Sequence, residues 1–161
     1  MVFDLTKLPL CYMIAITGIT KDGESMILRI DFNSDEAIYI QLRNQIIMGI
    51  ATDMIREGDT LPSVRQMADY IGINMHTVNK AYSVLRQEGF VKLDRRRGAV
   101  VSLNYDKIQA VRELSQNLDV MLAWGICRHI TREEVHQLVD EIFDRYTRGC
   151  METEEKEADG E

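Results

Sequence analysis

The spacing of apolar residues changes once along this chain, from a helical period to a strand period, and that change constrains the fold most. Three successive segments, 33–58, 61–72 and 74–89, repeat apolar residues every three or four positions, as one face of a helix does. Two short strand-like runs follow at 90–93 and 99–103, and the sequence DRRRG lies between them as a hairpin tip. Three short helices followed by a two-stranded hairpin form the pattern of a winged helix-turn-helix.

Capping signals set the expected ends of these helices. The first helix is expected to stop near Gly58. Ser63 and Gln66 have the spacing of a capping box that opens the second helix. Asn74 is a typical N-cap for the third helix, and the tight joint YIGIN at 70–74 supplies the turn between the two. We therefore predict a mostly α-helical chain with a small β-hairpin, and the winged helix-turn-helix domain spans residues 26–104.

The apolar spacing in residues 105–149 predicts two further helices, which would form a C-terminal arm. The first carries an apolar stripe with the spacing of a coiled-coil seam. The seam residues are Val111, Leu114, Leu118 and Met121. The second helix opens with Thr131 and Glu134 in capping-box spacing, has one apolar face and is expected to end at Gly149. Because an arm of this length cannot fully bury the seam against itself, we expect it to pair with a second subunit in a homodimer.

The two ends of the chain do not fit this architecture. Residues 150–161 are acidic and poor in apolar residues, which predicts a disordered tail. Residues 1–25 precede Met26, where the architecture begins, so we expect Met26 to be the natural start and the leader to be dispensable. The apolar run at 8–19 is too short and interrupted to cross a membrane, and its flanks do not fit a signal peptide. Three cysteines without CxxC spacing indicate reduced thiols and a cytoplasmic protein.

The charge is distributed unevenly, although the chain as a whole carries −7. Residues 1–35 carry −2, residues 36–104 carry +2 and residues 105–161 carry −7. Four of the nine positive charges in the middle segment lie between Lys92 and Arg97. Adjacent arginines are favourable beside a phosphate backbone, because each contact releases condensed counterions. A solvated basic turn without a ligand is the alternative interpretation.

Three stretches of this region resemble the GntR family of bacterial transcription regulators. They are LPSVRQMA at 61–68, IGINMHTVNKAYSVLRQEGF at 71–90 and RRRGAVV at 95–101. The short two-helix arm is similar to the YtrA-like branch, which lacks the large effector domains of other branches and is often encoded beside transporter genes. The resemblance implies a sequence-specific DNA-binding regulator, expected to be a repressor of its own or a neighbouring operon. If it is a homodimer, its operator is expected to be an inverted repeat.

The resemblance also implies which residues contact DNA. Ser63 and Arg65 begin the helix that crosses the DNA backbone. Met75 stands where the family's recognition helix often has an arginine, which leaves base readout to its neighbours. The predicted DNA-binding residues are Ser63, Arg65, Asn74, His76, Thr77, Asn79, Lys80, Arg95, Arg96, Arg97 and Gly98. Asn74 and Thr77 could instead serve only as helix caps, and His76 could be an ordinary surface residue.

Other functions stay open at this point. A winged helix could act as a protein-interaction module whose basic wing contacts an acidic partner, and the arm could sense a metal or a small-molecule effector. The candidate metal ligands are Cys127, His129, Glu133, His136 and Asp140, and the candidate pocket residues are Met121, Trp124 and Phe143. A solvated helix face and a dimer core explain the same residues. The sequence has no Ser-His-Asp, paired-carboxylate or phosphate-loop pattern, so we expect no enzyme, no cofactor and no metal.

Overall fold

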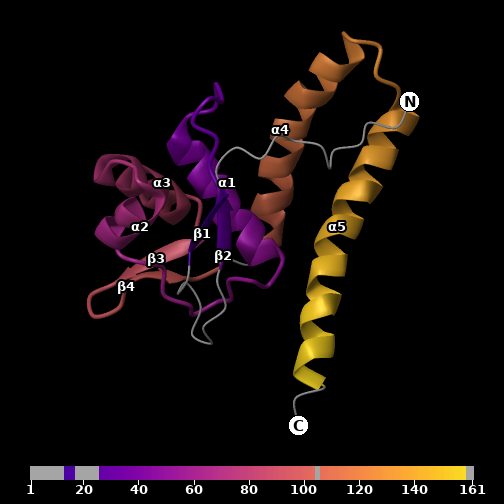
Figure 1. The fold of residues 1–161 in the computed structure, drawn as a ribbon. Coiled ribbons are helices and arrows are strands. Elements are labelled where there is room, and N and C mark those ends of the chain that lie inside the picture. Colours follow the sequence, from indigo (N-terminus) through magenta and orange to yellow (C-terminus); the bar gives the residue numbers. More distant parts are fainter. Residues whose placement is uncertain (1–12, 17–25, 104–105, 159–161) are drawn as a thin grey trace. The chain divides into compact units, whose positions relative to one another are not determined.

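A computed structural model describes residues 13–16, 26–103 and 106–158 (Figure 1). Its elements in chain order are β1 Met13–Ile16, β2 Met26–Arg29, α1 Ile38–Ala51, α2 Val64–Ile71, α3 Met75–Gln87, β3 Val91–Asp94, β4 Gly98–Val101, α4 Lys107–Ile126 and α5 Arg132–Ala158. The chain divides after Leu103 into two compact units, the winged-helix unit and the C-terminal arm. The predicted fold class, a mostly α-helical chain with a winged helix-turn-helix and two C-terminal helices, is confirmed.

The helices of the winged-helix unit pack around a single apolar core. Each helix buries the face that its periodicity predicted. The buried residues include Leu42 and Ile46 from α1, Met67 and Ile71 from α2, and Val78 and Leu85 from α3. Tyr82 is also buried, and its hydroxyl donates a hydrogen bond to the Pro62 carbonyl oxygen at 2.8 Å. Burial raises the pKa of Tyr82 far above its usual value, so the hydroxyl stays a donor that joins α3 to the start of α2.

The joint between α2 and α3 has the predicted turn chemistry. The Gln66 backbone N–H donates to the Ser63 hydroxyl at 3.3 Å, and the Ser63 backbone N–H donates to Gln66 Oε1 at 3.0 Å, which completes the capping box. Gly72 ends α2 with φ of 73°, a left-handed conformation that favours glycine. The chain therefore turns between α2 and α3 within residues 72–74, and the start of α3 is exposed.

The first helix is shorter than its periodicity predicted. α1 ends at Ala51, well before Gly58. The Thr52 hydroxyl donates back to the Met48 carbonyl oxygen at 2.9 Å, and Asp53 adopts φ of 56°, which a right-handed helix cannot continue. Ile55 returns to the core from this irregular segment, so its apolar spacing reflects burial rather than helix.

The N-terminal hairpin joins part of the expected leader to the core. β1 pairs antiparallel with β2, from Met13 opposite Arg29 to Ile16 opposite Met26. Just after the pairing, the buried Gln41 side chain accepts from the Asp31 backbone N–H at 2.8 Å and donates to the Asp31 and Glu36 carbonyl oxygens. Residues 1–12 and 17–25 lie outside the described residues, so the dispensable leader stays a prediction.

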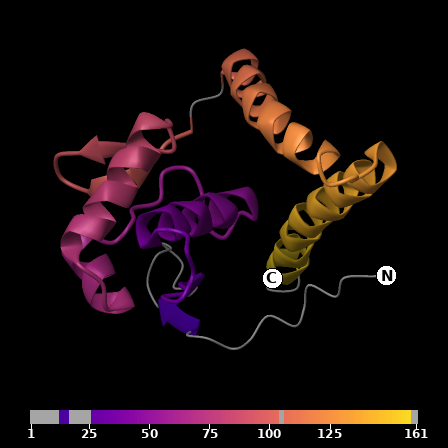
Figure 2. The same ribbon diagram turned by 90° about the horizontal axis from the view of Figure 1, so that it is seen from above.

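The wing is a two-stranded sheet with a third backbone segment beside it. β3 and β4 pair from Val91 opposite Val101 to Asp94 opposite Gly98. The Leu61 backbone N–H donates to the Ala99 carbonyl oxygen at 2.8 Å, so the segment before α2 runs along β4. This pairing and the burial of Val100 and Val101 fix the hairpin beside α3 (Figures 1 and 2).

The arm consists of α4 and α5 joined by a short turn. The Thr131 N–H donates to Glu134 Oε2 at 2.7 Å and the Glu134 N–H donates to Thr131 Oγ1 at 3.2 Å, as the capping-box spacing predicted. α5 does not end at Gly149, as the sequence predicted, but continues to Ala158, so most of the expected disordered tail is helical. One glycine costs a helix only about 1 kcal/mol, and the glutamates that follow are good helix formers. No helix among the described residues is both long and apolar enough to span a membrane.

Candidate nucleic-acid interface

The exposed face of α3 gathers the polar residues predicted to read DNA. With about 3.6 residues per turn, His76, Asn79 and Lys80 lie on the side opposite the buried Val78 and Leu85. All three are exposed. The helix thus separates a core face from a polar face that could enter a major groove about 12 Å wide.

Two residues on this face were missed by the sequence reasoning. Ser83 is half-buried and Gln87 is exposed. Ser83 lies four positions after Asn79, and Gln87 lies four positions after Ser83, so helical spacing alone would have found both. They extend the polar face along α3 beyond its first turn.

Asn74 and Thr77 occupy different positions from the other predicted readers. Asn74 Oδ1 accepts from the His76 backbone N–H at 2.8 Å, and the Asn74 carbonyl oxygen accepts from the Thr77 N–H at 2.9 Å. The side chain of Asn74 therefore acts as the N-cap. Thr77 is half-buried at the edge of the helix. The geometry thus gives Asn74 a capping role and leaves His76 and Asn79 as the more accessible of the predicted readers.

Two polar contacts join α3 and its end to α1, beside the apolar core that the two helices share. The Lys80 ammonium lies 3.8 Å from the centre of the Tyr39 ring, a cation–π contact. At the far end of the helix, Arg43 forms a bidentate ion pair with Glu88, with both N–O distances at 2.8 Å. The Tyr39 contact holds the ammonium of Lys80 on the α1 side of the exposed face.

Ser63 and Arg65 lie at the start of α2, as the family resemblance implied. The Ser63 hydroxyl accepts from the Gln66 backbone N–H and also contacts Gln66 Oε1 at 2.8 Å. Ser63 is therefore engaged in the capping box but remains exposed. Arg65, in the first turn of α2, is exposed and carries the positive charge of this helix start.

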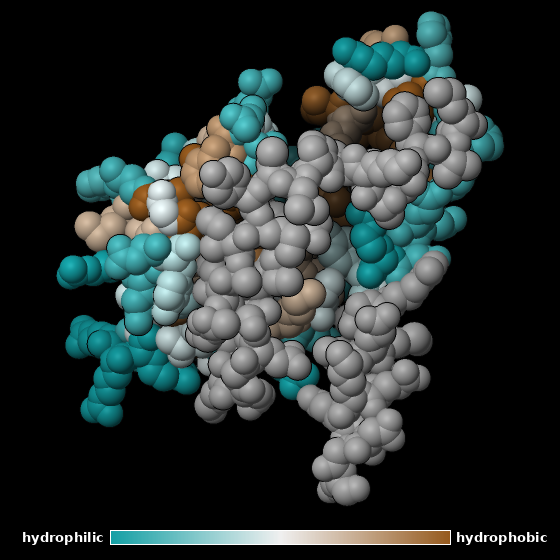
Figure 3. Space-filling view, in the orientation of Figure 1, coloured by the Kyte–Doolittle hydropathy of each residue, from teal (hydrophilic) through white to brown (hydrophobic). Residues whose placement is uncertain are grey.

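The wing tip is organised by a single carboxylate. Asp94 Oδ1 accepts from the backbone N–H groups of Arg97 at 2.9 Å and Arg96 at 2.8 Å, and these hydrogen bonds hold the pKa of Asp94 below its usual value. The side chains of Arg95, Arg96 and Arg97 are exposed. In Figure 3, hydrophilic side chains project from the side of the winged-helix unit that holds this tip.

Gly98 closes the tip in a conformation that other residues rarely adopt. Its φ is 82°, and a Cβ added there would meet no atom within 4 Å. The turn, rather than crowding inside the protein, therefore requires glycine. The open space beside it would also let the backbone approach a ligand closely.

Comparison with known proteins identifies the group to which this architecture belongs. Residues 35–101 match the family described as bacterial regulatory proteins, gntR family. The chain is 30% identical over 109 residues to the HTH-type transcriptional regulator YhcF of Bacillus subtilis, an alignment that covers 65% of this chain and 88% of YhcF. It is also 30% identical over 118 residues to the HTH-type transcriptional repressor YtrA of the same bacterium, covering 71% of this chain and 91% of YtrA.

This chain belongs to the GntR family. GntR-family proteins of this kind are DNA-binding transcription regulators, and the likeness to YtrA makes this chain a YtrA-like member. The fold is also similar to the crystal structure of a transcriptional antiterminator from Listeria monocytogenes EGD-e. The TM-score is 0.67 at 26% identity, and the match covers 73% of this chain and 90% of that one. These relatives of the GntR protein are transcriptional regulators.

The seam predicted on α4 is exposed within the arm of this GntR protein. The exposed fractions of its four residues, in the order Val111, Leu114, Leu118 and Met121, are 56%, 58%, 38% and 66%. Among the arm residues whose burial the structure describes, Gly125 alone is buried. The arm therefore has an apolar face that its own two helices do not cover.

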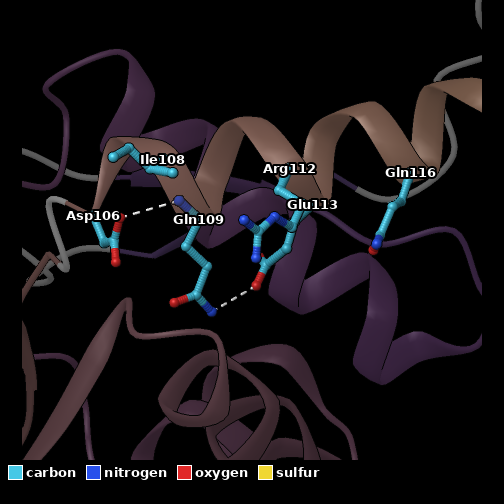
Figure 4. A pocket seen from close by; sticks show the side chains of 6 residues that line it. All are labelled: Asp106, Ile108, Gln109, Arg112, Glu113 and Gln116. Carbon is cyan, nitrogen blue, oxygen red and sulfur yellow. Dashed lines mark hydrogen bonds between the residues drawn. The ribbon is translucent and has the colours of Figure 1, made fainter.

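The face of α4 away from the seam is mostly polar and carries two hydrogen bonds near its start. Asp106 accepts from the Gln109 backbone N–H at 3.0 Å, and Gln109 Nε2 donates to Glu113 at 2.9 Å (Figure 4). These residues line a shallow hollow together with Ile108, Arg112 and Gln116. α4 is thus amphipathic, with its solvated side distinct from the exposed seam.

The residues considered for a sensor do not form a compact site. Among the described residues, no group of three His, Cys, Asp or Glu side chains lies close enough to hold a metal ion. The candidate pocket residues Met121, Trp124 and Phe143 are each more than half exposed. The Arg128 guanidinium lies over the Trp124 ring, 3.9 Å from its centre. The described arm therefore offers an aromatic–cation pair at its turn rather than an enclosed pocket.

Proposed function

We propose that this GntR-family regulator is a homodimeric repressor that binds an inverted-repeat operator of its own or a neighbouring operon. The exposed apolar seam of α4 is the observation that carries the proposal. An apolar stripe of this kind is covered when two copies of the helix pair through it. The similarity to a relative named as a transcriptional repressor supports the sign of regulation.

Dimerisation would also raise the affinity of the protein for its operator. A single winged helix buries little surface on DNA, so one copy binds weakly. Joining two copies makes the second binding event intramolecular, which raises the affinity by about 100-fold or more without new contacts. A two-fold symmetric protein then reads two half-sites in opposite orientation, spaced by about one helical turn. The acidic arm, with its charge of −7 over residues 105–161, would stay away from the DNA phosphates.

The positions of the side chains support different proposed roles for the DNA-binding residues. His76 and Asn79 at the start of α3 read base edges in the major groove. Lys80, Arg65 and the three wing arginines contact phosphate and fix the register of the protein on the duplex. Ser63 and Asn74 act mainly by holding the helix starts in place, and Gly98 lets the wing backbone approach the DNA. The protein acts in the cytoplasm, where the chromosome of a prokaryote lies.

A charge placed on the seam tests the proposal. We expect Leu118→Glu to give a folded monomer that loses about 100-fold or more of its operator affinity but keeps weak non-specific binding. Gln116→Glu is the matched control, because it adds the same charge to the polar face of the same helix. Sedimentation measures the assembly, and gel shift with operator and random DNA measures binding.

Each outcome has a clear meaning. The control should remain dimeric and bind as tightly as the parent. A Leu118→Glu protein that stays dimeric, or a monomer that binds the operator as tightly as the parent, would contradict the proposed homodimer. Tight binding to an acidic protein partner with no preference for any DNA sequence would favour the alternative of a protein-interaction module.

A further inference from the structure

Met75 is an exposed apolar residue at the start of α3, the proposed recognition helix. It is the first residue of α3, and 51% of its surface is exposed. The residue before it is the cap, Asn74, and the exposed residues after it include His76 and Asn79, which are polar. Met75 lies three positions before the buried Val78 and so borders the buried face of α3, yet half of its surface stays outside the core.

The chemical groups in the major groove limit the partners that an apolar side chain can have there. Residues at the start of a recognition helix reach the base edges. Those edges offer hydrogen-bond donors and acceptors together with one apolar group, the C5-methyl of thymine. A thioether sulfur is only a weak hydrogen-bond acceptor, whereas the methionine side chain can cover a methyl group and its unbranched shape adapts to the surface that it meets. In unmodified DNA, thymine is the only source of that methyl.

We propose that Met75 determines specificity by contacting the methyl group of one thymine in each half-site. The neighbouring Asn74 has its side-chain oxygen committed to the His76 N–H at 2.8 Å, so the cap does not compete for the same base. His76 and Asn79 read polar edges of adjacent bases, and Met75 adds a preference that polar side chains cannot supply. The inference rests on the proposed sequence-specific binding to an operator.

The test removes the methyl group from the DNA without changing any hydrogen bond. A preferred site is first selected from a synthetic duplex library, which contains no methylated cytosine. Each thymine of the selected half-site is then replaced by deoxyuridine, and the dissociation constants are measured. We expect one position at which the replacement weakens binding by about fourfold per half-site, the factor that corresponds to one buried methyl group.

Two variants connect that position to Met75. Met75→Gln keeps the length of the side chain but makes its end polar, and we expect it to bind the thymine and deoxyuridine sites equally well. Met75→Leu keeps the apolar surface, and we expect it to retain the discrimination. His76→Ala serves as the matched control, because it should weaken operator binding and leave the discrimination at the Met75 position unchanged. Thermal unfolding of each variant checks that the fold is intact.

The results separate this inference from the proposed function. A library that yields no preferred sequence would overturn sequence-specific binding itself. A clear preferred site at which no thymine shows the deoxyuridine effect would overturn the role of Met75 and leave the regulator intact. A deoxyuridine effect that persists in Met75→Gln would assign the methyl contact to another residue and also overturn the inference.

Discussion

Removing the wing arginines tests whether the hairpin tip lies on the phosphate backbone. Arg95, Arg96 and Arg97 are exposed on a turn that Asp94 and Gly98 hold in place. Each phosphate contact on B-DNA contributes about 0.9 to the slope of log affinity against log salt. In a homodimer, Arg96→Ala removes one contact from each wing and should flatten the slope by about two. Replacing all three arginines should flatten it by about five.

Fluorescence anisotropy with labelled operator and random duplexes, from about 50 to 300 mM salt, measures these slopes. Because phosphate contacts carry no sequence information, both DNAs should lose affinity to a similar extent. Arg112→Ala is the control: it removes one exposed positive charge from the polar face of α4, outside the winged-helix unit, and should leave the slope unchanged. A triple wing variant with the slope of the parent would refute the assignment of the tip to phosphate.

Three further changes test other parts of the structure. His76→Ala should cost about 1–3 kcal/mol on the operator and little on random DNA, and equal losses on both DNAs would remove it from the base-reading residues. Gln41→Ala should lower the free energy of unfolding in urea by about 2–3 kcal/mol, because it removes the three hydrogen bonds that the buried Gln41 side chain makes with the Asp31 and Glu36 backbone; a loss below about 0.5 kcal/mol would mean that water replaces the side chain. Deletion of residues 1–25 should preserve folding and DNA binding, because Leu28 and Ile30 stay in the core, and loss of either property would show that the β1–β2 pairing is required.

The features that the sequence predicted correctly depend on residues that are close together in the chain. The capping boxes at Ser63 and Thr131 and the N-cap at Asn74 involve residues two or three positions apart, so their spacing in the sequence carries the geometry. The wing followed from the change in apolar period between residues 89 and 99. The exposed face of α3 could be predicted for the same reason, including Ser83 and Gln87, which helical spacing indicated but the sequence reasoning overlooked.

The features that were not predicted depend on contacts between distant parts of the chain. The backbone segment through Leu61 runs along β4, nearly forty residues later in the sequence, and no local pattern indicates this pairing. The cation–π contact between Tyr39 and Lys80 joins α1 to α3, two helices that are distant in the sequence. The early end of α1 was missed because Ile55 is buried at a position that also fits a helical repeat.

Footprinting of the full-length protein on the DNA upstream of its own gene tests the central claim most directly. A homodimeric regulator with one recognition helix in each subunit should protect two half-sites in inverted orientation, with centres about one helical turn apart. Protection should require far less protein than binding to random DNA of the same length. Uniform weak protection without a preferred site, or protection of a single unpaired half-site at the same protein concentration, would contradict the account.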